Sequence, residues 1–276
     1  MELFNSELVY LISLMLGAGA LAGIAAGLFG IGGGLIVVPA LIMFFPMLEV
    51  PPEYVVHMAI GTSLSTIIFT SFRSAQAHHS KGSVDFHIIK IWWIWLVVGS
   101  ILGILFAASL KAKTIMILFG CFLFVLSFKF IFPNIFKKIK LGEEMPGGIL
   151  LAVLGIFLGS CSALFGIGGG SISIMIMSLY GTEIHKAIGT ASALAIPIVL
   201  PGAIGFAIMG WGQEGLPVGS LGFVSLIGLV GIVVTSMLTA PLGAKLAHKL
   251  NPITMKKVFG FYILFTALNM LRENLF

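Results

Sequence analysis

The chain has 276 residues, of which 59% are hydrophobic and 9% are charged, with a formal net charge of +5. Soluble globular domains carry about 25% charged residues, so the composition excludes that class. Apolar runs long enough to span a bilayer recur along the chain, and the short alternating segments of a membrane β-barrel are absent. The sequence therefore predicts an all-α polytopic membrane protein. Its positive charge indicates cytoplasmic loops rather than nucleic-acid binding.

Ten apolar segments are expected in chain order, five in each half of the chain. In the first half they cover 7–29, 35–47, 54–77, 87–109 and 112–132. In the second half they cover 147–165, 171–180, 185–209, 216–247 and 252–271. The second segment of each half is too short to cross a bilayer on its own.

The two halves resemble each other. "FGIGGG" occurs at Phe29–Gly34 and again at Phe165–Gly170, each time after a leucine, and "HMAIGTS" from His57 matches "HKAIGTA" from His185. Self-similarity at a constant offset indicates an internal duplication. We therefore expect an N-terminal transmembrane repeat at 1–136, a linker at 137–146 and a C-terminal transmembrane repeat at 147–276.

The distribution of lysine and arginine favours an inverted topology. If each glycine motif joins a helix hairpin that enters and returns, 12 of the 15 Lys and Arg residues fall on one side of the membrane. A single crossing at each motif divides them 8 to 7. Positive residues concentrate in cytoplasmic loops. We therefore expect two inverted-topology repeats, each a glycine-broken helix hairpin plus three transmembrane helices, with the linker cytoplasmic and both termini extracytoplasmic.

The glycine motifs are the strongest functional signal in the sequence. Helices broken at equivalent places in inverted repeats are typical of secondary transporters, and a helix that starts at such a break presents free N–H groups and a positive dipole end. These features bind anions. We therefore interpret the breaks and the start of the second short helix as one anion site near mid-membrane, made by Gly30, Gly32, Gly33, Gly34, Gly166, Gly168, Gly169, Gly170 and Ser171. The alternative is that the motifs are packing turns, as the spacing of Gly19 and Gly23 indicates for their own helix.

Hydroxyl side chains supply further candidate substrate ligands. Ser63, Thr66, Thr70 and Arg73 share one face of the helix at 54–77, and their equivalents in the second half are not polar. We expect Ser63, Thr66 and Arg73 to line the substrate path. Interhelical hydrogen bonding and snorkelling to the interface are the alternative roles. Thr62 and Thr190, which occur in both copies of "IGT", are candidate second donors. We expect His78 and His79 to be solvated in a basic loop.

Other classes of function find no support in the sequence. Every carboxylate falls at a segment end or in a loop, which argues against a carboxylate proton relay at mid-membrane. No nucleophile–histidine–acid set and no metal-ligand cluster converge at membrane depth, so we expect no enzyme, no cofactor and no metal. Cys121 and Cys161 lie in apolar segments and are interpreted as small buried residues rather than a disulfide.

The motifs resemble a known family. "LFGIGGGLIVVPAL", the second "LFGIGGG", "AIGTSL" and "AHHSKGSVDF" are similar to the TauE/SafE sulfite exporter family, also called the four-toluene-sulfonate uptake permeases. The resemblance implies a duplicated helical permease for sulfite, sulfonates or related small sulfur-containing anions in the bacterial cytoplasmic membrane. Export is the favoured direction. An anion channel of the same architecture and an uptake permease for an organic anion stay open, as does a homo-oligomer. Met175 stands where Pro39 would be repeated, which indicates that the two half-sites differ.

Overall fold

The computed structural model describes residues 2–133, 140–247 and 252–275. The first three residues of the predicted linker, 137–139, lie outside the described residues. The first half contains α1 (Glu2–Phe29), α2 (Gly34–Phe44), a 3-10 turn (Phe45–Leu48), α3 (Pro52–His79), α4 (Phe86–Ser109) and α5 (Ala112–Ile131). The second half contains α7 (Gly148–Phe165), α8 (Gly170–Leu179), α9 (Ile184–Met209), α10 (Leu226–Leu246) and α11 (Pro252–Leu275).

The prediction of an all-α polytopic membrane protein is confirmed. Among the described residues, seven helices are long and apolar enough to cross a membrane: α1, α3, α4, α5, α7, α9 and α10. Helices α2 and α8 are the short apolar segments that follow the glycine motifs. Helix α11 carries Lys256, Lys257 and Arg272 and falls outside the seven, so its crossing stays a prediction.

One predicted segment is wrong at its start. Residues 216–247 do not form a single helix, because a two-stranded hairpin of β1 (Ser220–Leu221) and β2 (Val224–Ser225) precedes α10. Glycines with left-handed backbone angles interrupt this stretch at Gly219 and Gly222. Ser225 then caps α10 by accepting a hydrogen bond from the amide of Gly228.

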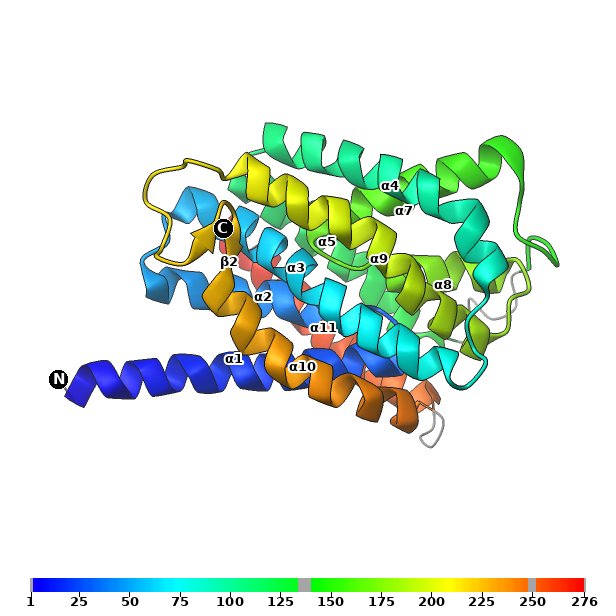
Figure 1. Cartoon of the computed structure of the whole chain (residues 1–276), viewed down its shortest axis with the longest axis horizontal. Coiled ribbons are helices and arrows are strands. Elements are labelled where there is room, and N and C mark those ends of the chain that lie inside the picture. The colour runs from blue at the N-terminus through cyan, green and yellow to red at the C-terminus, as the bar shows by residue number, and fades with distance from the viewer. Residues whose placement is uncertain (1, 134–139, 248–251, 276) are drawn as a thin grey trace.

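The helices pack in pairs that correspond between the halves. Helix α1 lies against α10, and its counterpart α7 lies against α4, while α3 packs on α9 and α5 on α11 (Figure 1). Small residues allow the backbones to approach: a Cβ on Gly23 would lie 2.4 Å from the carbonyl oxygen of Ser236, and one on Gly159 would lie 2.3 Å from that of Leu96. The packing role predicted for Gly19 and Gly23 agrees with these contacts.

The first and last helices place both ends of the chain toward one end of the molecule (Figure 1). Helices α1 and α7, which begin the two halves, run in opposite directions along the long axis of the molecule in this view. Inverted repeats require such opposite directions, but the inversion itself stays a prediction. The orientation of the halves relative to a membrane stays a prediction.

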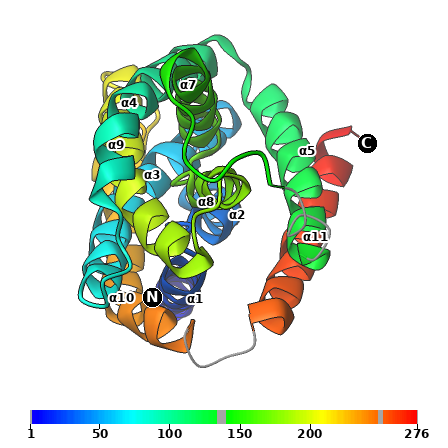
Figure 2. The same cartoon turned by 90° about the vertical axis from the view of Figure 1, so that its right-hand side faces the viewer.

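The centre of the bundle is α3, together with the two short helices. In the apolar segment of α3, 83% of the residues are buried inside the protein, whereas the other six candidate spans have 28–50% of theirs buried. Seen along the long axis, α2 and α8 lie in the middle, α4, α9 and α10 lie to one side, and the α5–α11 pair lies to the other (Figure 2). The elements that follow the glycine motifs are therefore interior.

Candidate functional site

The two glycine motifs break the helices where the sequence predicts. In the first break Gly30, Gly32 and Gly33 have φ angles of 63°, 73° and 84°, and α2 starts at the next residue. In the second break Gly166 and Gly169 have φ angles of 67° and 69°, and α8 follows. Residues with a Cβ rarely adopt these angles, so the turns depend on glycine.

The two breaks touch each other in the core. A Cβ added to Gly170 would lie 1.9 Å from the carbonyl oxygen of Gly30, and one added to Gly34 would lie 2.5 Å from that of Gly166. Residues 30–34 and 166–170 are all buried. The glycines therefore serve two needs at once, left-handed turns within each break and close backbone approach between the breaks.

Helices α3 and α9 hold the breaks from either side. A Cβ on Gly30 would lie 2.6 Å from the carbonyl oxygen of Ile188 in α9, and one on Gly166 would lie 3.0 Å from the Cα of Ile60 in α3. Ile60 and Ile188 occupy the same place in the repeated "AIGT" motif. The repeated "AIGT" motif thus packs directly on the repeated "FGIGGG" motif. Each copy of "AIGT" contacts the glycine break of the opposite half.

Backbone amides at both breaks lack internal partners. In the first break the amide of Gly30 donates to Ala26, and the next backbone bond is from Ile36 to Gly33. In the second break the amide of Ile167 donates to Ser162, and the next backbone bond is from Ser173 to Gly169. Within the described part of the chain, the amides of 31–35 and 168–172 form no backbone hydrogen bond of standard geometry. Buried amides without a partner are costly, and a ligand is one explanation for their persistence.

The predicted polar face of α3 reaches both breaks. The Ser63 hydroxyl donates to the carbonyl of Gly166 at 2.7 Å, and the Thr70 hydroxyl is 3.1 Å from the carbonyl of Gly32. Thr66 is buried and donates to the carbonyl of Ser63 in its own helix, at 2.7 Å. These hydroxyls fix the carbonyl sides of the breaks, leaving the amide sides for another acceptor.

Each break also has a buried hydroxyl without a partner among the described residues. These are Ser71 Oγ at the first break and Ser171 Oγ at the second. A Cβ on Gly32 would lie 3.2 Å from Ser71 Oγ, while Ser171 is the second residue of α8. Ser171 was a sequence candidate and Ser71 was missed. The signal for Ser71 was a second polar stripe on α3, continued by Ser74 and His78.

Thr62 and Thr190 occupy equivalent positions and accept equivalent bonds. The amide of Ser225, which caps α10, donates to Thr62 Oγ1, and the amide of Asp85, which caps α4, donates to Thr190 Oγ1, both at 2.9 Å. Their oxygen atoms thereby anchor the starts of two helices. If the two threonines also bind substrate, they can do so by donating their hydroxyl hydrogens to it.

Arg73 and His78 lie in the last two turns of α3. Arg73 is partly exposed and donates to the side-chain oxygen of Gln76 at 2.7 Å, and no described contact brings it to a break. The prediction that His78 is solvated is wrong, since it is 2% exposed and its Nε2 is 3.2 Å from the carbonyl of Gly27. His79 is exposed, as predicted. The helical period turns His78 inward onto the end of α1.

A cationic residue near the second break was not a sequence candidate. Lys129 on α5 donates a hydrogen bond from Nζ to the carbonyl of Ser171. In the sequence analysis Lys129 was only one of the 12 basic residues placed on the cytoplasmic side of the membrane. Its position inside the apolar segment 112–132 was the available signal, because a charge within a spanning helix is a functional-site indicator.

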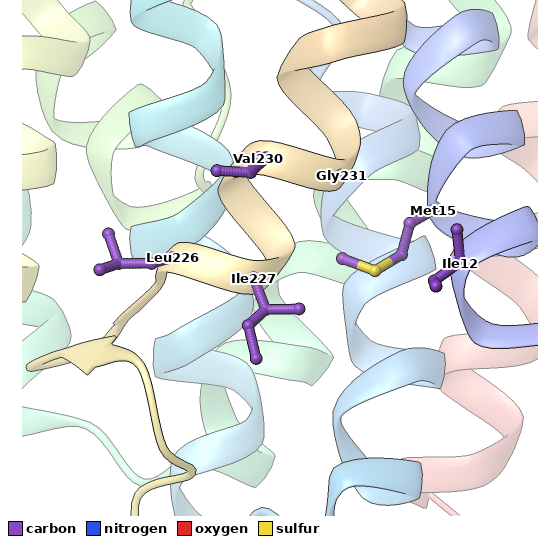
Figure 3. A pocket seen from close by; sticks show the side chains of 6 residues that line it. All are labelled: Ile12, Met15, Leu226, Ile227, Val230 and Gly231. Atoms are coloured by element: carbon purple, nitrogen blue, oxygen red, sulfur yellow. The ribbon is translucent and has the colours of Figure 1, made fainter. Parts of the chain in front are cut away.

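A lateral cleft of 480 Å³ between α1 and α10 is distinct from the breaks. Its lining is formed by Ile12, Met15, Leu226, Ile227, Val230 and Gly231 (Figure 3). The lining offers hydrocarbon and no charged donor, so the cleft is unsuited to an anion. No group of three or more metal-ligating side chains was found among the described residues.

Comparisons with known proteins agree with the motif pattern. The family model described as "Sulfite exporter TauE/SafE" matches residues 15–270. A "Probable membrane transporter protein" of Haemophilus influenzae is 34% identical over 259 residues, which cover 94% of this chain and 97% of the relative. The "Probable membrane transporter protein YdhB" of Bacillus subtilis is 30% identical over 86% of this chain and 90% of its own length. No solved structure matches the chain.

The matched region begins in α1 and ends in α11, so it includes both glycine breaks and the helices around them. The chain is a multi-pass membrane transporter and not an enzyme. It belongs to the TauE/SafE sulfite exporter family.

Proposed function

We propose that this transporter is a secondary permease for sulfite, sulfonates or related small sulfur-containing anions, with the anionic group bound at the two touching breaks. One observation supports this most strongly. Each break combines buried amides and a buried serine hydroxyl that have no hydrogen-bond partner among the described residues. Such N–H and O–H donors suit the oxygens of a sulfur oxyanion. The name of the matched family points to the same substrate class.

Export is the favoured direction. An interior-negative membrane potential drives an anion outward with about 2.3 kcal/mol per charge per 100 mV. A multiply charged anion could therefore leave the cell without a coupling ion. Uptake of an organic anion stays the alternative, because direction depends on gradients as well as on the site.

The closed packing around the breaks favours a permease over a channel. Residues 30–34 and 166–170 are buried on all sides by protein. A buried site must open alternately to the two sides of the membrane, and it then gives saturable flux and counterflow. An open channel gives neither.

The test is labelled sulfite flux into liposomes that contain the full chain, with sulfonates and thiosulfate as competitors. Gly168→Ala is the informative variant, because Gly168 has no left-handed φ and its added Cβ would lie 3.1 Å from Ile67 and 3.2 Å from Ala195. The fold can absorb that methyl by small shifts of these neighbours, and the methyl is added next to the amides that we propose bind the anion. We expect flux to fall about tenfold, as loss of one charged hydrogen bond predicts.

Gly17→Ala is the matched control, since a Cβ at Gly17 meets nothing within 4 Å. It should retain full flux. Equal flux in wild type, Gly17→Ala and Gly168→Ala would mean that the breaks only pack helices. If the protein transports sulfonates but not sulfite, the site at the breaks stands and the substrate is a sulfonate.

A further inference from the structure

The two breaks repeat the same glycine motif but carry unequal charge. In the register that aligns Gly120 with Gly260, Lys129 corresponds to Asn269. Asn269 is exposed and bonds Glu273 at 3.0 Å, on the outside of α11. In the register of the glycine motifs, Ser171 corresponds to Leu35. The second break therefore has a lysine and a serine at positions where the equivalent residues of the other half are asparagine and leucine.

The position of Lys129 is electrostatically unfavourable in the absence of a ligand. Its ammonium group bonds the carbonyl of Ser171, in the first turn of α8. The N-terminal end of a helix carries partial positive charge and favours anions, while cations favour the C-terminal end.

The two helices that meet at Lys129 and Ser171 supply no compensating negative charge among the described residues. The first turn of α8 contains no acidic residue, and neither α5 nor α8 contains an aspartate or glutamate. The observed partner of the ammonium is a neutral carbonyl. Positive charge from a side chain and from a helix end is thus gathered in the protein interior.

The hydroxyl at the same turn is available to a ligand. Ser171 is 4% exposed, and its Oγ has no partner among the described residues. The amides of Gly170, Ser171 and Ile172 also form no internal hydrogen bond. The Lys129 ammonium, the Ser171 hydroxyl and the free amides of the α8 N-terminus therefore meet at the first turn of α8.

Resting on the proposed function, we infer that the second break is the charge-recognition half of the site, where Lys129 and Ser171 bind the anionic oxygens of the substrate. The oxyanion replaces the missing negative charge beside Lys129 and accepts from Ser171 Oγ. The first break, with no cation of its own, holds the less charged part of the same molecule. Lys129 then determines how strongly the protein prefers a doubly charged anion over a singly charged one.

The test compares wild type, Lys129→Met, Lys129→Arg and Ser171→Ala in liposomes. Half-saturation and maximal flux are measured near neutral pH for sulfite, for thiosulfate, which is a dianion there, and for methanesulfonate, a monoanion. Lys129→Met removes a charged hydrogen bond, so the sulfite concentration that gives half-maximal flux (half-saturation) should rise about tenfold to a hundredfold. The rise for methanesulfonate should be smaller, so the preference for the dianion narrows.

Lys129→Arg should restore most of the affinity and the charge preference, which a purely structural role would not require. Lys113→Met on the same helix is the control, since Lys113 is exposed. Calorimetric binding to protein in detergent separates affinity from transport, and Ser171→Ala tests the site if Lys129→Met does not fold. Half-saturation for sulfite unchanged in both Lys129→Met and Ser171→Ala overturns the inference.

The two proposals fail in different ways. If Gly168→Ala loses flux while Lys129→Met keeps wild-type half-saturation and charge preference, the site at the breaks stands and the role of Lys129 is refuted. If the wild-type protein neither binds nor transports sulfite, sulfonates or thiosulfate, the proposed function and this inference fall together.

Discussion

The two glycine breaks share one motif but differ in one backbone angle, since Gly32 has a left-handed φ and its counterpart Gly168 does not. They differ more in the side chains that surround them. The first break lies beside Ser71 and Thr70 of α3, without a cation within its described contacts. The second lies beside Ser63 of α3 and carries Ser171 and Lys129. Glycine positions set the backbone and must be kept in both halves. The side chains around that backbone are free to diverge, and they give the asymmetry that an asymmetric anion needs.

The largest expected effect is on the contact between the breaks. Gly170→Ala puts a Cβ 1.9 Å from the carbonyl oxygen of Gly30, and Gly34→Ala puts one 2.5 Å from that of Gly166. Both acceptors are buried backbone, which cannot move aside as a side chain can. We expect each variant to lose about 3 kcal/mol or more of stability, with Gly170→Ala the worse.

Thermal unfolding in detergent measures this effect, with Gly17→Ala as the reference. Wild-type melting of Gly170→Ala would show that the breaks do not touch as described. Equal melting of the two alanine variants would show that the contact is symmetric.

The next effect separates the two unpartnered hydroxyls. Ser171→Ala should raise half-saturation for sulfite about tenfold, because its Oγ shares the ligand with Lys129. Ser71→Ala should raise it only about threefold, as a neutral hydrogen bond predicts. Flux assays on both variants decide the order, and a larger effect at Ser71 would place the charged end of the substrate at the first break.

Thr62 and Thr190 test the part of the structure that the halves share. Thr62→Val and Thr190→Val each leave a helix-capping amide without its acceptor, at Ser225 and Asp85. We expect similar losses of about 1–2 kcal/mol in stability and little change in half-saturation. Melting and flux measured on the same preparations check this. A large rise in half-saturation with unchanged melting would make the threonines substrate ligands instead.

The smallest expected effect concerns the first residue of each motif. Phe29 stacks on Phe259 of α11 with ring centroids 4.9 Å apart, and Phe165 stacks on Phe119 of α5 at 5.5 Å. Phe119 and Phe259 correspond in the alignment of the halves. Phe29→Leu and Phe165→Leu should each cost about 1 kcal/mol in thermal stability, the size of an aromatic pair contribution. A much larger loss in one variant would show that the α5–α11 pair holds the two breaks unequally.

Much of the fold follows from sequence because bilayer physics restricts it. Apolar length alone locates the spanning helices, and left-handed glycines end α1 and α7 where "FGIGGG" occurs. Hydropathy fails at 216–225, where Leu216, Val218 and Leu221 extend the apolar run into a loop. The backbone angles of Gly219 and Gly222 decide the structure there, and hydropathy does not register them.

The site was predictable in its glycines and less so in its side chains. The duplication identified both breaks, and helical spacing identified Ser63 and Thr70 as residues on one face. That Ser71 adjoins Gly32 and that Lys129 reaches Ser171 depend on how α3 and α5 pack. A single sequence does not encode such contacts at any fixed spacing. Arg73 had the right chemistry, but it is partly exposed and its described hydrogen bond is to Gln76 rather than to a break.

We propose above all that a sulfur oxyanion binds between the two touching breaks. The most direct test is calorimetric binding of sulfite, methanesulfonate and thiosulfate to purified wild type, Gly168→Ala and Gly17→Ala. We predict saturable binding of at least one of these anions by wild type and Gly17→Ala, and affinity about tenfold weaker in a Gly168→Ala protein that still unfolds cooperatively. Equal affinity in all three proteins would place the anion site elsewhere in the molecule.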